Sequence, residues 1–140
     1  MTAELPLLLD TCAAIWISEE QPLATEALTA IEQSHRSGES MYVSPITAWE
    51  IGLLVSRGKL TSPMSPQRWF ERLLQAPGVR LADMSRDVLI ASSFLPGAPP
   101  RDPADRILAA TAREYGYRLM TRDTPLLTYA RQGHLQALAC

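Results

Sequence analysis

Short apolar runs alternate along the chain with longer segments in which apolar residues recur every three or four positions. The leucines at 7–9, followed at once by Asp10, are typical of a strand that is buried on both faces of a sheet. Four later runs share this strand character. We therefore predict five short strands, at residues 6–10, 41–44, 79–82, 118–121 and 135–139.

The segments between these runs carry the signals of helix starts and ends. Pro45 can open a helix that Gly58 stops, and Asp102 can cap a helix that begins at Pro103 and ends at Gly116. Helices are predicted at residues 11–18, 22–37, 45–57, 67–75, 87–95, 103–115 and 125–131, with one clear loop at 96–103. Strands that alternate with helices predict an α/β fold in which a parallel sheet is covered on both faces.

Length and composition agree with a single domain over residues 1–140. The 140 residues are 46% hydrophobic and 20% charged, which is ordinary for a globular protein and excludes a disordered one. No apolar run approaches the roughly 20 residues of a membrane span, and no basic segment precedes the first apolar run as in a signal peptide. We therefore expect a cytoplasmic protein without membrane contact. Cys12 is expected to pack as a small hydrophobic residue beside the first strand.

The charges are unevenly distributed. The net charge is −2, yet residues 101–140 carry six arginines and four acids. This balance excludes a general polyanion binder, so any contact with nucleic acid must be local. Lys59 is the one lysine among 13 basic residues. Arginine has the fork geometry that suits phosphate, although a genome rich in G and C would produce the same preference.

Four carboxylates lie at positions that the fold alone does not explain. Asp10 and Asp123 directly follow predicted strands, and open α/β sheets bind ligands beyond the carboxyl ends of their strands. Ser44 and Thr121 end strands in the same way and could supply hydroxyl groups to one pocket. For Asp10 the alternative is a purely structural role, as the cap of the helix that begins at Thr11.

Glu50 is the most unusual of the four. It lies in a nearly apolar helix and has no cation one turn away with which to pair. A carboxylate in a core costs several kcal/mol unless a cation compensates it. A long-range ion pair with an arginine is the alternative to a metal site.

The last acidic pair opens the helix after the loop. Asp102 and Asp105 occupy the cap and third positions, where acids stabilise a helix start, so a structural role also remains open. Asp105 is better placed on the wall of a site, and Asp102 is better placed as the cap. Arg106 could separate the acids or contact a substrate phosphate.

Carboxylates that converge repel one another unless protons or a cation resolve the repulsion. Ligand sets made only of oxygen select Mg²⁺ or Mn²⁺ over zinc, and such sites suit the hydrolysis of phosphodiesters. Three arginines flank the predicted cluster and are candidates to hold an RNA substrate: Arg101, Arg106 and Arg122.

Four segments, in this order and spacing, resemble the PIN-domain nucleases, and more narrowly the VapC-type toxins of bacterial toxin–antitoxin pairs. They are Leu-Leu-Leu-Asp10-Thr11, Val-Ser44-Pro-Ile-Thr-Ala-Trp49-Glu50-Ile51, Arg-Asp102-Pro-Ala-Asp105-Arg106 and Leu-Met-Thr121-Arg122-Asp123. One departure is Pro100, where relatives often carry histidine.

The resemblance implies a three-layer α/β/α sandwich with a central five-stranded, mostly parallel sheet. It also implies a Mg²⁺-dependent endoribonuclease in which Mn²⁺ can substitute, homodimerisation, and inhibition by a cognate antitoxin. The family's catalytic and metal-binding quartet corresponds to Asp10, Glu50, Asp105 and Asp123. Supporting groups correspond to Thr11, Ser44 and Thr121, with Asp102 beside them.

Three other functions compete with a PIN-domain nuclease. A haloacid dehalogenase-type phosphatase needs an acid where this chain has Cys12, and a receiver domain needs a lysine late in the chain, where there is none. A catalytically idle PIN-like module that binds RNA or protein remains open, although the complete quartet argues against it. Trp16 and Trp69-Phe70 are candidate anchors for a protein interface, with core packing as the alternative.

Overall fold

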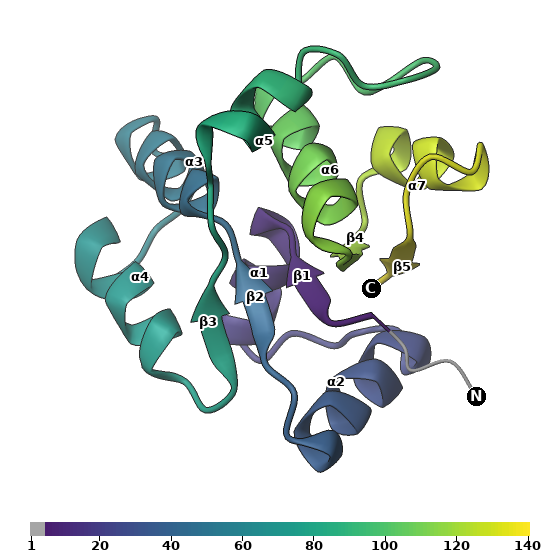
Figure 1. Ribbon diagram of the computed structural model, residues 1–140. Coiled ribbons are helices and arrows are strands. Elements are labelled where there is room, and N and C mark those ends of the chain that lie inside the picture. Colours follow the sequence, from purple (N-terminus) through teal and green to yellow (C-terminus); the bar gives the residue numbers. More distant parts are fainter. Residues whose placement is uncertain (1–4) are drawn as a thin grey trace.

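The structure is a computed structural model that describes residues 5–140, and a five-stranded sheet lies at its centre (Figure 1). All neighbouring strands pair in parallel, in the order β3-β2-β1-β4-β5. The strands are β1 (Leu7–Leu9), β2 (Met41–Val43), β3 (Val79–Leu81), β4 (Arg118–Thr121) and β5 (Ala137–Ala139). The predicted parallel sheet is therefore confirmed. Over the described part of the chain, no helix is long and apolar enough to cross a membrane.

In the described part of the chain, seven helices connect the strands, and most begin where a polar side chain can cap them. Asp10, Ser44, Asp102 and Asp123 each accept a hydrogen bond from a backbone N–H in the first turn that follows. The helices are α1 (Thr11–Ser18), α2 (Thr25–Ser37), α3 (Pro45–Ser56), α4 (Pro66–Gln75), α5 (Arg86–Ala91), α6 (Pro103–Tyr115) and α7 (Thr124–Arg131).

Three predicted boundaries differ from the structure by more than one residue. The second helix begins at Thr25 instead of residue 22, because the Pro22 carbonyl accepts a hydrogen bond from a distant side chain and lies outside the helix. α5 ends at Ala91 instead of residue 95, because Ser93 and Phe94 form tighter bonds to carbonyls three residues back before the chain reaches Pro96. β5 begins at Ala137 instead of residue 135.

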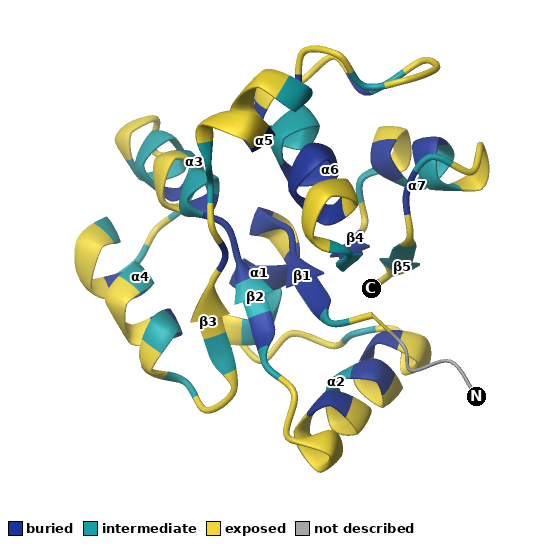
Figure 2. Ribbon diagram, in the orientation of Figure 1, coloured by how far each residue is buried: buried dark blue, intermediate teal, exposed yellow. Residues whose placement is uncertain are grey.

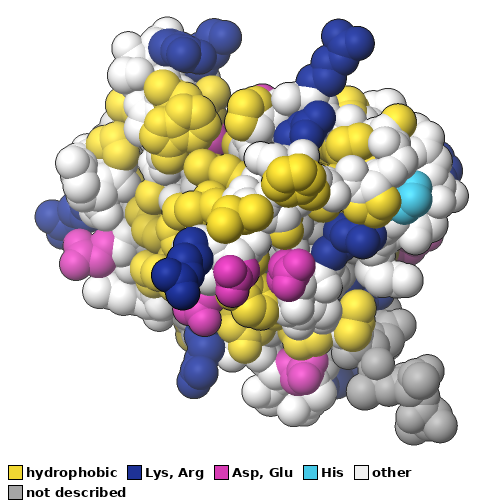
Figure 3. Space-filling view, turned by 45° about the horizontal axis from the view of Figure 1, so that its top comes forward, with side chains coloured by type: hydrophobic (Ala, Val, Ile, Leu, Met, Phe, Trp, Pro, Cys, Tyr) yellow, Lys and Arg dark blue, Asp and Glu magenta, His cyan; other side chains and the backbone are white. Residues whose placement is uncertain are grey.

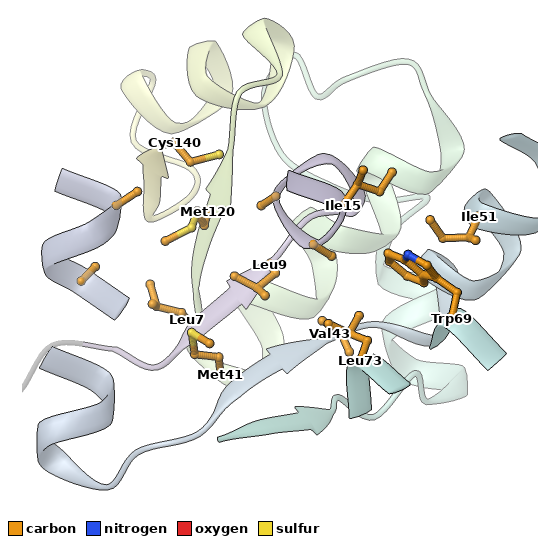
Figure 4. Close-up of a cluster of buried hydrophobic side chains, with 14 residues drawn as sticks. Leu7, Leu9, Ile15, Met41, Val43, Ile51, Trp69, Leu73, Met120 and Cys140 are labelled. Atoms are coloured by element: carbon orange, nitrogen blue, oxygen red, sulfur yellow. The ribbon is translucent and has the colours of Figure 1, made fainter. Parts of the chain in front are cut away.

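Successive side chains of β1 point to opposite faces of the sheet, and this divides the core into two layers. Leu7 and Leu9 belong to a cluster that α1, α2 and α4 cover, together with Ile51 of α3 and Trp69 of α4 (Figure 4). Leu8 belongs to the opposite cluster, which α6 and α7 cover. The centre of the sheet is buried from both sides, whereas the outer faces of the helices are exposed (Figure 2). This arrangement is the expected three-layer α/β/α sandwich.

Candidate functional site

The site is built on the carboxyl ends of the two central strands, β1 and β4. The backbone N–H of Asp10 donates to the Met120 carbonyl across 3.1 Å, which sets Asp10 beside the next residue, Thr121. Thr121 Oγ1 donates to Asp10 Oδ2 across 2.5 Å, and Ala13 N donates to Asp10 Oδ1 across 2.7 Å. Asp10 is 5% exposed, so both of its oxygens are fixed in a nearly closed position. It caps α1 and also faces the other acids.

Thr121 connects Asp10 to Asp123. Its Oγ1 accepts a hydrogen bond from Asp123 N across 2.9 Å while its proton goes to Asp10. Asp123 Oδ2 in turn accepts from Leu126 N across 3.0 Å and caps α7. One buried hydroxyl therefore sets the spacing of two strand-end acids.

A second hydroxyl network holds Glu50, which lies on the second turn of α3. Thr11 Oγ1 donates to Glu50 Oε1 across 2.5 Å, and it lies 3.1 Å from Thr47 Oγ1. Because Thr11 gives its one proton to Glu50, the hydroxyl of Thr47 donates to Thr11. Thr47 is fully buried and was not among the predicted site residues. Its position three residues before Glu50, on the same helix face, was the available signal.

The first turn of α6 supplies the fourth carboxylate. Asp105 N donates to Asp102 Oδ1 across 3.0 Å, so Asp102 is the cap, as expected, and it is exposed. The Asp105 side chain is partly buried. Ser44 is buried at the end of β2 and accepts from Ile46 N across 3.1 Å, so its hydroxyl acts as the cap of α3.

Burial and mutual repulsion make these acids reluctant to ionise. Burial is the largest cause that raises the pKa of Asp10, Glu50 and Asp105 above the usual range. The pKa of Asp105 reaches about 7, with the Asp123 charge as the next cause. Within residues 5–140, no arginine or lysine nitrogen lies within 4.0 Å of these carboxylates, so no ion pair with an arginine is seen at Glu50.

Cys12 also borders the cluster, where the expectation of a packed side chain is wrong. It is exposed, because the second position of α1 faces away from the sheet toward the acids. Burial and the charges of Asp10, Glu50, Asp105 and Asp123 raise its pKa to about 11, so the thiol stays protonated.

The three arginines take different places. Arg101 is exposed on the loop before α6. Arg106 Nε donates to the Pro100 carbonyl across 2.7 Å and fastens that loop to the helix that carries Asp105. Arg122 stacks on Trp16 and donates to backbone oxygens, away from the acids.

The donor set suits a hard divalent cation. Among the side chains of residues 5–140, no three of Asp, Glu, His or Cys already form a closed ligand group. Mg²⁺ does not require one, since it is commonly held by one or two carboxylates together with water and substrate phosphates. Asp10, Glu50, Asp105 and Asp123 could hold such an ion, which would relieve the repulsion among their charges.

Comparison with known proteins points to the family that the four sequence segments resemble. The sequence matches the PIN domain family over residues 7–132. It is 33% identical over 124 residues to Ribonuclease VapC22 of Mycobacterium tuberculosis (strain ATCC 25618 / H37Rv), with 88% of this chain and 91% of that protein covered.

Two solved structures have the same fold. One is the crystal structure of VapBC2 from Rickettsia felis bound to a DNA fragment from their promoter, with TM-score 0.68, 15% identity, and 96% of this chain and 98% of that chain covered. The other is a toxin–antitoxin complex from Klebsiella pneumoniae, with TM-score 0.61, 22% identity, and 94% and 95% covered. The family match and the likeness to the ribonuclease show that the chain belongs to the PIN domain family, among its VapC-type members.

Proposed function

We propose that this protein is an endoribonuclease and the toxin of a toxin–antitoxin pair. It hydrolyses RNA phosphodiesters at the carboxylate site with a divalent cation, Mg²⁺ or in its place Mn²⁺, in the cytoplasm. One observation carries the proposal: β1, α3, α6 and the β4–α7 connection bring Asp10, Glu50, Asp105 and Asp123 close enough for their charges to interact, and no basic side chain of residues 5–140 forms an ion pair with them. The 33% identity to a protein named as a ribonuclease supports RNA as the substrate.

The chain's own residues divide the work at this site. A cation bound there would act as a Lewis acid and lower the pKa of a water molecule. Asp10 is held by Ala13 N and Thr121, so its oxygens need no reorganisation during the reaction. Burial raises the pKa of Glu50 above its usual range, and Thr11 binds only Oε1, so the other carboxylate oxygen could accept a proton from that water.

The expected substrate is single-stranded or looped RNA. A duplex has a stiff backbone and hides its bases, whereas a loop can be splayed into a site. Arg101 is exposed next to the cluster and can meet a phosphate, while Arg106 holds the loop on which Arg101 lies.

The antitoxin is proposed to occupy an apolar pocket of about 580 Å³ between α1, α2 and α4. Ile17, Ile31 and Met64 line it, with Trp69 at its base and the polar groups of His35 and Arg72 also among its lining residues. Apolar pockets with a few polar groups are typical of ligand-binding sites. Trp69 was a predicted interface residue, and it lines this pocket although it is 8% exposed.

A second copy of the chain is proposed to bind through exposed hydrophobic side chains of α3 and α5. Trp49 on α3, Ile90 on α5 and Phe94 just beyond it are 54%, 59% and 79% exposed. Figure 3 shows hydrophobic side chains gathered over this face of the molecule. Exposed apolar patches of this kind mark interaction surfaces. Trp16, another residue expected at a protein interface, is covered by Arg122.

The test is cleavage of a pool of structured RNAs by protein freed of any antitoxin. We expect cleavage with Mg²⁺ or Mn²⁺, none with EDTA, and almost none for Asp10→Asn, which keeps the shape of the carboxylate but removes its charge. Glu32→Gln, an exposed acid on α2, is the matched control and should cleave normally. Cleavage that resists EDTA would refute the metal mechanism, and no cleavage of any RNA would favour the idle binding module.

A further inference from the structure

Arg122 has three partners, and none of them is a carboxylate of the site. Its guanidinium carbon lies 3.2 Å from the centre of the Trp16 ring. Its Nε donates to the backbone oxygen of Cys140, and its Nη2 donates to the Pro22 carbonyl across 3.1 Å. One side chain therefore joins the end of β4 to α1, to the segment before α2 and to the residue after β5.

These partners use the parts of the guanidinium that would bind a phosphate. The Nε and Nη2 groups form an edge with two parallel N–H bonds, which is the geometry of bidentate phosphate contacts. Here both groups are bonded to backbone oxygens, and an indole covers one face of the plane. A bidentate phosphate contact through this edge would need both hydrogen bonds to break.

The backbone of Arg122 lies between two site residues. β4 ends at Thr121 and α7 begins at Thr124, so only Arg122 and Asp123 connect them. Thr121 is fully buried and points at Asp10, whereas the next side chain along the chain, Arg122, is exposed and lies over Trp16. Fixing Arg122 from outside therefore fixes the two residues on either side of it.

Two hydrogen bonds of the site depend on the position of Arg122. Thr121 Oγ1 must stay 2.5 Å from Asp10 Oδ2, and Asp123 N must stay 2.9 Å from the same hydroxyl. A small rotation of the connection would lengthen both. Such a rotation would disturb the site and not the sheet, because the backbone pairing of β4 with β1 and β5 ends at Met120 and Thr121.

We propose that Arg122 is a positioning residue: clasped by Trp16, Pro22 and Cys140, it holds Thr121 and Asp123 in place against Asp10. The proposal rests on the carboxylate site as the centre of the proposed nuclease. It replaces the role in substrate binding that the sequence suggested for this arginine.

The test compares Arg122→Leu, Arg122→Lys, Trp16→Leu and the double variant Arg122→Leu/Trp16→Leu. We expect kcat and Mn²⁺ affinity to fall about tenfold or more in both leucine variants, as is usual for groups that orient metal ligands, while KM for RNA is unchanged. Because both residues act through one clasp, the double variant should be no worse than the poorer single variant. Arg122→Lys keeps the charge but not the fork, so it should also be impaired.

Amide hydrogen exchange gives a measure that does not depend on nuclease activity. In Arg122→Leu the amides of Asp123 and Leu126, which donate to Thr121 and Asp123, should exchange faster than in the wild type. Arg131→Leu is the matched control, since Arg131 is an exposed arginine bonded to Thr128 on α7, and it should change none of these measurements.

Two outcomes overturn the proposal. If Arg122→Leu raises KM and weakens the salt dependence of RNA binding, with kcat and Mn²⁺ affinity intact, the arginine binds RNA. If amide exchange is unchanged, the clasp does not position the site. If the wild type cleaves no RNA and binds no Mn²⁺, the proposed function fails, yet the exchange measurement still decides the role of Arg122.

Discussion

At the scale of single residues, the metal-free site stores repulsion that can be removed by neutralising one charge. Burial and neighbouring acids raise the pKa of both Asp105 and Glu50. Asp105→Asn and Glu50→Gln should therefore melt at the same temperature as the wild type in EDTA, or higher. With Mg²⁺ at about 100 times its dissociation constant, the wild type should gain about 2.7 kcal/mol, or roughly 5–10 °C, and both variants should lose most of this gain.

The control for these melts is Glu71→Gln, an exposed acid on α4, which should leave the melting temperature unchanged in EDTA and in Mg²⁺.

The effect of Asp105→Asn on the melting temperature should also depend on pH. Because the pKa of Asp105 is raised to about 7, its protonated form stabilises the fold at low pH, and this stability is lost as the pH rises through about 7. The advantage of Asp105→Asn in EDTA should therefore grow from acidic to alkaline pH. A Glu50→Gln variant that melts several degrees lower in EDTA would instead show that the charged carboxylate stabilises the fold.

At the scale of elements, α2 presents two faces with different expected roles. Ile31 lines the pocket between α1, α2 and α4, whereas Leu28, one turn earlier, is 48% exposed and does not line it. Ile31→Glu should place a charge in an apolar binding site and weaken co-purification with the antitoxin, sought as the product of the adjacent reading frame. RNA cleavage should be unchanged, because the pocket lies apart from the acids.

Leu28→Glu is the matched control for the pocket and should bind the antitoxin normally. Equal loss in both variants would indicate that the partner covers another face of α2, or that the added charge disturbs the helix itself. Melting curves of the two variants separate these cases.

At the scale of the whole molecule, the hydrophobic surface of α3 and α5 predicts self-association. Burying Trp49, Ile90 and Phe94 against a second copy would remove a large apolar patch from water. We expect a dimer in sedimentation at micromolar concentration, and a shift toward monomer for Ile90→Glu. Leu5→Glu, an exposed residue before β1, should leave the dimer intact. A monomeric wild type would contradict this surface without affecting the nuclease proposal.

The sequence determined the elements and the place of the site, because the signals involved are local. Leu7 to Leu9, followed at once by Asp10, are typical of a strand buried on both faces, and Asp102-Pro103 with Gly116 marks both ends of α6. Parallel strands bring their carboxyl ends to one edge, so Asp10 and Asp123 were expected to be neighbours before any contact was known. The anomaly of Glu50 was visible for the same reason, since helix periodicity alone shows that it has no basic partner nearby.

Only the tertiary structure decided the contacts of Arg122, Thr47 and Cys12. Each of these side chains could face the site or turn away from it. For Thr47 and Arg122 the orientation depends on residues 35 or more positions away in the chain. Thr47 contacts Thr11, and Arg122 contacts Pro22 and Trp16. Cys12 is exposed because of the way α1 lies on the sheet, with the acids rather than the core on its outer side. Local periodicity places a residue on a face, but which element covers that face is fixed only when the layers pack.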